Sequence, residues 1–258
     1  MPLDKLERFY TARNLRRRLG RAHELDFFEV NAITTSGWQD DFQGDLFRGG
    51  AAPGMYQSTA SGAAAATAAI STGVVNGAAL LDAGTDNAGR SDLSWGLHYR
   101  GDLGATYIAR FSINTLTTRK FEIGFTDVLS GTDAGAVNVK ATPSFNADNA
   151  AVLVFDTDAN TTLTLVGVKA TVAATVANFS STLVAATYYY FGVQLFDDNA
   201  RGFLLDANGA LMEEEVIEDA VTETTLLTPW LFVQNRAANA GSMTLDWHRA
   251  YQRRTTTI

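Results

Sequence analysis

Few side chains in this sequence could act as a catalytic base or as a reactive nucleophile. The chain has three histidines, His23, His98 and His248, and no cysteine among its 258 residues. A Ser-His-Asp arrangement needs a positioned histidine, and no Gly-x-Ser-x-Gly elbow occurs. Signatures for a zinc protease, a phosphate-binding loop or a dinucleotide site are absent as well. We therefore interpret each histidine as structural and expect that the protein is not an enzyme.

One acidic segment partly matches a calcium-binding loop. Asp156, Asp158 and Asn160 stand at its first, third and fifth positions, where their oxygens would converge on a hard cation. The sixth position is Thr161 instead of glycine, and the twelfth is Gly167 instead of glutamate. Because the sharp turn and the bidentate ligand are both missing, the sequence predicts a plain hairpin turn, with no metal and no cofactor. A calcium site shared with another acidic loop stays open.

The densest group of carboxylates is the run Glu213, Glu214 and Glu215. Glycoside hydrolysis needs two carboxyl groups that face each other across about 5 to 10 Å. Along a strand, Glu213 and Glu215 would share a face, with no basic or aromatic residue beside them. The run is more typical of a solvated strand edge, where charge discourages aggregation.

The four tryptophans are the other candidates for contact with a sugar, because apolar sugar faces pack on aromatic rings. Trp230 and Trp247 lie in segments with the apolar alternation of a core strand, so we expect both rings in the core. Trp38 and Trp95 remain as candidate exposed rings for carbohydrate binding.

Charge divides the chain into a basic head and an acidic body. The formal net charge is −8, but residues 1–21 have seven basic and two acidic side chains, a balance of +5, and the remaining thirteen basic and twenty-six acidic side chains give −13. Residues 4–25 predict an amphipathic helix of strong helix formers. We expect residues 1–26 to be an attachment arm; the alternative is a solvated helix that caps the body. The partner-binding candidates are Arg13, Leu15, Arg16, Arg17, Arg18, Leu19 and Arg21.

After Phe28 the hydrophobic pattern changes to a period of two, which indicates a β-sandwich or barrel over residues 27–258. Lys120–Thr126 shows it best, with one apolar and one polar face. About eleven strands are expected. They are Ala78–Asp82, Leu93–Tyr99, Tyr107–Ile113, Lys120–Thr126, Ala151–Phe155, Thr162–Val168, Tyr188–Phe196, Gly202–Asp206, Leu211–Ile217, Trp230–Gln234 and Met243–Tyr251.

The segments between these strands predict how the strands connect. Thr115–Arg119 and Asp156–Thr161 read as hairpin loops, and Asn208-Gly209 is a strong two-residue turn signal. The low-complexity segment at residues 58–73, rich in alanine, is expected to be an extended loop, although its composition also suits a helix or a loose strand.

The C-terminal motifs resemble a concanavalin A-like, lectin/glucanase-type jelly roll. The resemblance rests on the segments Thr187–Leu195, Ala200–Gly209 and Met243–Arg254, a strand, a hairpin and a closing strand in the order that this family shows. It implies an antiparallel β-sandwich. The glucanase signature Glu-x-Asp-x-Glu is missing, and Glu122-Ile-Gly-Phe does not supply it. The chain is also similar in style to virion proteins of tailed bacteriophages, which join a short arginine-rich helix to a sandwich without cysteine.

These features together predict a non-enzymatic phage virion protein. We expect a capsid decoration or minor capsid protein that is anchored to other virion proteins by its N-terminal helix; a carbohydrate-binding tail-fibre or receptor-recognition module is the alternative, with host-surface glycans as partners. The acidic body argues against nucleic acid or an anionic membrane as a partner, and a homo-oligomer stays open. No apolar stretch approaches the roughly 20 residues of a membrane-spanning helix.

Overall fold

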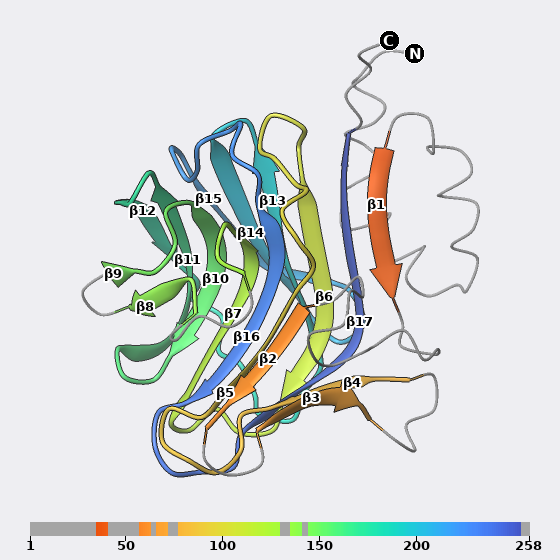
Figure 1. Cartoon of the computed structure of the whole chain (residues 1–258), viewed down its shortest axis with the longest axis vertical. Helices are drawn as coiled ribbons and strands as arrows, with labels where there is room; N and C mark the ends of the chain where they lie inside the picture. The colour runs from red at the N-terminus through yellow and green to blue at the C-terminus, as the bar shows by residue number, and fades with distance from the viewer. Residues whose placement is uncertain are drawn as a thin grey trace.

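The computed structural model describes residues 35–40, 57–62, 66–71, 77–129, 135–140 and 144–253. Two antiparallel sheets pack face to face in a β-sandwich (Figure 1). The described residues contain no helix, and hence none that is long and apolar enough to cross a membrane. The helix predicted at residues 4–25 and the boundary after residue 26 lie outside these ranges.

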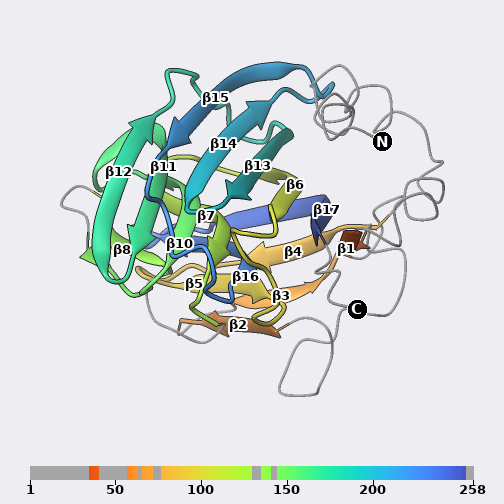
Figure 2. The ribbon, with the colours of Figure 1, turned by 90° about the horizontal axis from the view of Figure 1, so that it is seen from above.

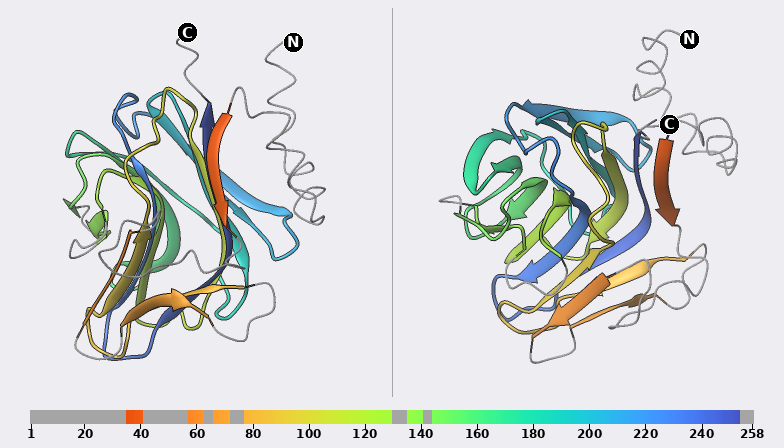
Figure 3. Two further views of the ribbon diagram at one scale, coloured as in Figure 1. Left: turned by 45° about the vertical axis from the view of Figure 1, so that its right-hand side comes forward. Right: turned by 45° about the horizontal axis from the view of Figure 1, so that its top comes forward.

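The first sheet, called sheet A, has eight strands within the described residues. Its final strand β17 pairs with β6 along one edge and with β4 and then β1 along the other. Figure 3 shows β1 running beside β17. In spatial order the strands are β15 (Leu211–Ile217), β14 (Asn199–Leu205), β13 (Tyr189–Phe196), β6 (Thr106–Ile113), β17 (Ser242–Arg253), β4 (Ala79–Asp82) and β3 (Thr67–Ile70), with β1 (Thr35–Asp40) also on β17.

The second sheet, sheet B, has seven strands within the same ranges. Figure 2 shows β15, β14 and β13 of sheet A next to β12, β11 and β10 of sheet B, with which they are in contact. The order is β12 (Val172–Asn178), β11 (Asn160–Lys169), β10 (Ala150–Asp156), β7 (Arg119–Thr126), β16 (Thr228–Asn235), β5 (Arg90–Ser94) and β2 (Gln57–Ser61). A short hairpin of β8 (Val137–Val139) and β9 (Ser144–Phe145) pairs with neither sheet.

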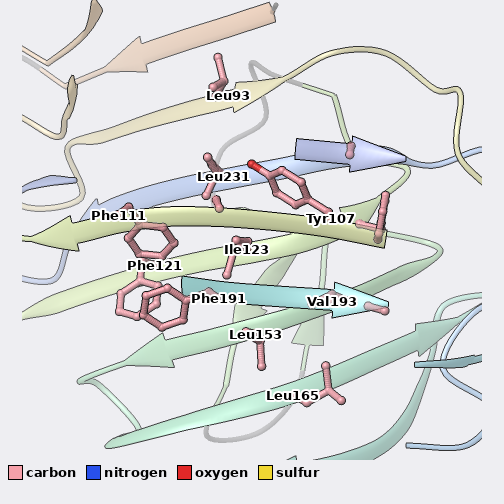
Figure 4. Packing of buried hydrophobic residues seen from close by; sticks show 14 of the residues in the cluster. Leu93, Tyr107, Phe111, Phe121, Ile123, Leu153, Leu165, Phe191, Val193 and Leu231 are labelled. Carbon is pink, nitrogen blue, oxygen red and sulfur yellow. The ribbon is translucent and has the colours of Figure 1, made fainter. Parts of the chain in front are cut away.

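The core lies between the sheets and is built from alternate residues of each strand (Figure 4). Phe111 and Phe191 of sheet A stack with ring centroids 4.3 Å apart, and both rings contact Phe121 of sheet B edge-on. Each of these rings is at most 2% exposed. Burial of one such ring contributes about 1.5–3 kcal/mol, so this cluster anchors the two sheets to each other.

Two predictions about connections have different outcomes. The hairpin expected between Ala151–Phe155 and Thr162–Val168 is confirmed, since β10 pairs with β11. The hairpin expected at Thr115–Arg119 is wrong, because β6 belongs to sheet A and β7 to sheet B. Alternation predicts that both strands cover the core, but it does not tell partners within one sheet from strands facing each other across the core.

The segment at residues 58–73 contains two strands where a loop was expected. It contains part of β2, at the edge of sheet B, and the whole of β3, at the edge of sheet A. The prediction of an extended loop is therefore wrong for these residues. Small side chains are compatible with short edge strands, because backbone hydrogen bonds to β5 and β4 hold the segment in place.

The face of sheet B that points away from sheet A is covered by the segment between β7 and β10. Ala136, Val137 and Ala147 of this segment pack against Val152, Trp230 and other residues of the sheet. Lys120 and Glu122, on the polar face of the strand predicted over Lys120–Thr126, are consequently fully buried. Figure 1 shows β8 and β9 on the side of β10 and β11 that faces away from sheet A.

Candidate functional site

The two tryptophans predicted as exposed sugar contacts belong to different sheets: Trp38 lies in β1 of sheet A, and Trp95 directly follows β5 of sheet B. Trp95 is 7% exposed, and its ring packs against Tyr107 and His248 with centroid distances of 5.3 and 4.7 Å. The expectation of an exposed ring at Trp95 is therefore wrong. Trp38 lies in β1, opposite Ala250 of β17. The arm residues Arg13, Leu15, Arg16, Arg17, Arg18, Leu19 and Arg21 lie outside the described ranges.

Trp247, which the alternation predicted as core, instead lies on the outer face of sheet A. A β-bulge interrupts β17 between Leu245 and Trp247. Leu245 and His248 are both fully buried toward the core, so the two residues between them, Asp246 and Trp247, face outward together. A bulge inserts one extra residue, which reverses the alternation for the rest of the strand.

Trp247 stands in a row of side chains that crosses three adjacent strands. Tyr190 of β13 is opposite Arg110 of β6, which is opposite Trp247 of β17. The rings of Tyr190 and Trp247 are 6.4 Å apart at an interplanar angle of 69°. These side chains are partly exposed, because the neighbours that alternate with them, such as Phe111 and Phe191, fill the core.

Arg110 is the centre of this group. Its guanidinium carbon lies 4.5 Å from the ring centroid of Tyr188 and 5.7 Å from that of Tyr190, and its NH1 group forms an ion pair with Asp246. Cation–π contacts of this kind contribute roughly 0.5–1 kcal/mol each at partly exposed sites. The rings and the carboxylate therefore hold the arginine in one orientation.

Phe203 of β14 adds a further ring on the same face. It lies opposite Gly192 of β13, and a Cβ atom at Gly192 would be 2.1 Å from the ring carbon Cζ of Phe203. The aromatic ring thus lies over the glycine and crosses toward β6. We call the group of Arg110, Tyr188, Tyr190, Phe203, Asp246 and Trp247 the aromatic–arginine face.

The electrostatics of this face are nearly balanced. Arg110 is paired with Asp246, and Arg201 of β14 is paired with Glu214 of β15. Burial raises the pKa of Tyr190, so its hydroxyl is protonated at neutral pH and can both donate and accept a hydrogen bond. The indole Nε1 of Trp247 and the Nε of Arg110 have no hydrogen-bond partner in the described part of the chain.

The carboxylates considered for chemistry are engaged in structural contacts. Glu122 accepts hydrogen bonds from the backbone N–H groups of Ala136 (2.7 Å) and Val137 (3.1 Å) and from Nε1 of Trp230 (2.9 Å), and it pairs with Lys120 at 3.0 Å. Its oxygens are consequently unavailable to a substrate.

The acidic turn Asp156–Asn160 also has a structural role. Asp156 is 1% exposed and accepts two hydrogen bonds from the guanidinium of Arg236, so a cationic group already occupies its carboxylate. Among the described residues, no group of three or more His, Cys, Asp or Glu side chains is arranged to hold a metal ion.

The glutamate run lies in β15, at the edge of sheet A, which agrees with the predicted strand edge. Glu213 accepts hydrogen bonds from the backbone N–H groups of Ser180 and Ser181 and from the Ser180 hydroxyl, at 2.7–3.0 Å. Partial burial alone would raise the pKa of Glu213, but these hydrogen bonds lower it to about 2. Glu213 therefore fastens the segment before β13 to the sheet edge.

Sequence reasoning missed Arg110, Tyr188, Tyr190, Phe203 and Asp246 as site residues. A signal for some of them was present, since Arg110 and Tyr190 occupy the polar positions of two strongly alternating strands. Their convergence depends on the pairing of β13 with β6 and of β6 with β17, which bring together residues far apart in the chain.

Comparison with known proteins places this fold among lectin-like sandwiches. The sequence matches no family model and no curated protein. Three similar solved structures are a protein of unknown function from Shewanella oneidensis MR-1 (14% identity, TM-score 0.62, 93% of this chain and 98% of that one), arcelin-5, a lectin-like defense protein from Phaseolus vulgaris (13%, 0.56, 86% and 100%), and the CBM2 module of the evolved Dit of Lactobacillus casei BL23 phage J-1 (11%, 0.51, 87% and 99%).

These similarities concern the fold alone, because each identity is below 25%. They confirm the predicted antiparallel, concanavalin A-like β-sandwich. The protein is thus a lectin-like β-sandwich with a row of aromatic and arginine side chains on the outer face of one sheet.

Proposed function

We propose that this protein is a non-enzymatic, lectin-like component of a phage particle, and that it binds glycans through the aromatic–arginine face. The observation that carries the proposal is the row from Tyr190 through Arg110 to Trp247. Its rings offer surfaces on which apolar sugar faces can pack, and the Arg110–Asp246 pair between them offers donors and acceptors for sugar hydroxyls. The lectin-like fold of the arcelin-5 and phage Dit structures supports this assignment.

A binding role is favoured over hydrolysis by the state of the carboxylates. Glycoside cleavage needs two carboxyl groups with access to the same bond. Glu122 is enclosed by four donor groups, and Asp156 is bound to Arg236. On the aromatic–arginine face, Asp246 is a single carboxylate that is already paired with Arg110.

We assign attachment to the particle to residues 1–26, with capsid decoration as the position expected and a tail fibre as the alternative. Arginines in this segment would form charge-assisted contacts with acidic surfaces of neighbouring virion proteins, and Leu15 and Leu19 would add buried apolar area. Residues 1–21 of this segment carry +5 against −13 for the rest of the chain, so the two parts suit different partners.

Glycan binding is tested by screening the full chain against immobilised glycans, with and without calcium. Trp247→Ala and Tyr190→Ala are each expected to weaken binding roughly tenfold, because each removes a ring contact of about 1 kcal/mol or more. Leu226→Ala, at a side chain that is 49% exposed and not among the residues of this face, is the control and should bind as the unaltered chain does. Absence of binding to every glycan would contradict the proposal.

Attachment is tested by removing residues 1–25. The sandwich is expected to stay folded, because the earliest described strand begins at Thr35. The shortened protein should still bind glycans but no longer join particles in a reconstitution assay followed by electron microscopy. Decoration at unchanged occupancy would show that residues 1–25 do not attach the protein.

A further inference from the structure

The positively charged side chains of the aromatic–arginine face and its neighbour strand each have a carboxylate partner. Arg110 pairs with Asp246 across β6 and β17, and Arg201 pairs with Glu214 across β14 and β15. These groups are 25–43% exposed, so a ligand on the face would meet both charges of each pair. Within these two pairs the positive charge is balanced, and residues 22–258 carry a net charge of −13.

The rings of this face form a strip across neighbouring strands: the Tyr190 and Trp247 rings approach each other across β6 with centroids 6.4 Å apart, and the Phe203 ring lies over Gly192 of β13. Tyr190 is on β13 and Trp247 on β17, with β6 between them, and Phe203 is on β14, on the other side of β13. Adjacent strands are about 4.8 Å apart, so the backbone positions of Tyr190 and Trp247 are separated by roughly 10 Å. A ligand that touches all three rings must extend across several strands.

From these two observations we propose that the face recognises internal units of an uncharged, extended polysaccharide. This inference rests on the proposed function and names its ligand class. Sugar hydroxyls both donate and accept hydrogen bonds, which matches a surface on which guanidinium and carboxylate groups alternate. An anionic sugar would have to approach Asp246 and Glu214 or displace them from their arginines, and either step costs free energy.

The test is calorimetric titration of the full chain with neutral glucan, mannan and galactan oligosaccharides from mono- to hexasaccharide. Galacturonate oligosaccharides of the same lengths are the anionic counterparts. The best neutral hexasaccharide is expected to bind about a hundredfold more tightly than its monosaccharide, since it adds at least two ring contacts of about tenfold each. It should also bind more tightly than the galacturonate hexasaccharide.

The variant Asp246→Asn tests the role of the carboxylate. It leaves Arg110 without its counter-charge, so galacturonate binding is expected to rise about tenfold while neutral binding changes less. Thermal unfolding of the variant checks that the sheet is intact. The comparisons between short and long oligosaccharides, and between neutral and anionic ones, are made with the unaltered chain and do not depend on this variant.

The outcomes separate the ligand class from the proposed function. Equal affinity for mono- and hexasaccharide, or galacturonate binding as tight as neutral binding, would overturn the inference and leave glycan binding in place. No binding to any oligosaccharide would overturn both. Binding that Trp247→Ala leaves unchanged would place the glycan elsewhere and overturn the inference for this face.

Discussion

Replacing Glu122 by leucine is expected to lower the free energy of unfolding by about 3–5 kcal/mol, the usual cost of breaking a buried ion pair from one side. The Lys120 ammonium is fully buried and would lose the carboxylate paired with it, while its contacts with the carbonyl of Val137 and the ring of Phe232 would stay. Three further donors, the N–H groups of Ala136 and Val137 and the indole of Trp230, would each lose their acceptor. Each buried donor left without an acceptor costs about 1–3 kcal/mol. A loss of about 3 kcal/mol is therefore a conservative value for the effect of Glu122→Leu on the free energy of unfolding.

The assay is guanidinium denaturation followed by tryptophan fluorescence, supported by thermal unfolding. For a domain of this size, 1 kcal/mol corresponds to about 2–4 °C, so the melting temperature should fall by roughly 6–20 °C. Glu214→Leu is the matched control, because that glutamate lies at the same strand edge in an exposed ion pair with Arg201 and its loss should cost no more than about 1 kcal/mol.

A double variant separates the charge from the hydrogen bonds. Lys120→Met combined with Glu122→Leu removes both charges, so it should be more stable than Glu122→Leu alone. It should remain about 1–3 kcal/mol below the unaltered chain, because the backbone and indole donors still lack an acceptor. A loss below about 1 kcal/mol for Glu122→Leu would refute the view that this carboxylate fastens the covering segment to sheet B.

Three further predictions concern buried groups. Burial lowers the pKa of Lys140 to about 8, so the unfolded state binds more protons between pH 8 and 10.5, and stability should rise by roughly 1–2 kcal/mol from pH 7.5 to 9.5. Lys140→Met should lack that rise in pH-dependent urea denaturation. Burial lowers the pKa of His248 to about 3, so the unfolded state again binds more protons and stability is lost as the pH falls below about 6.5. His248→Leu should lose about 2 kcal/mol less between pH 7 and 5 than the unaltered chain, and equal losses would contradict the assignment. Gly241→Ala should destabilise the protein by about 1–3 kcal/mol, because its Cβ would lie 1.8 Å from NH1 of the buried Arg119; unchanged thermal stability would show that the arginine can move aside.

Much of the architecture was predictable from local patterns. Alternation located the strands that became β6, β7, β10, β11 and β13 to β17, and the turn residues located the β10–β11 hairpin. These predictions succeed because a strand over a core must alternate, whichever strand it pairs with. The same rule does not distinguish sheet partners, which explains the error at Thr115–Arg119.

The site was much less predictable. Trp95 was misjudged because exposure depends on what packs against a ring, and here Tyr107 and His248 cover it. Trp247 was misjudged because the bulge beside Asp246 reverses the alternation of buried and exposed residues. The pattern of apolar residues in the sequence does not predict where a bulge occurs. Lys120 and Glu122 are buried because the segment between β7 and β10 covers the outer face of sheet B. That face also contains Trp230, which is distant from this segment in sequence.

The sequence by itself determined that this chain forms a β-sandwich, that it lacks a visible catalytic set, and that its charge is divided between a basic head and an acidic body. Those properties follow from composition and short-range periodicity. Only the tertiary structure decided that Tyr190, Arg110 and Trp247 form one row, because each comes from a different strand and strand pairing alone sets their register. The physical reason is that a surface for recognition is made by contacts between distant segments, which short-range patterns do not encode.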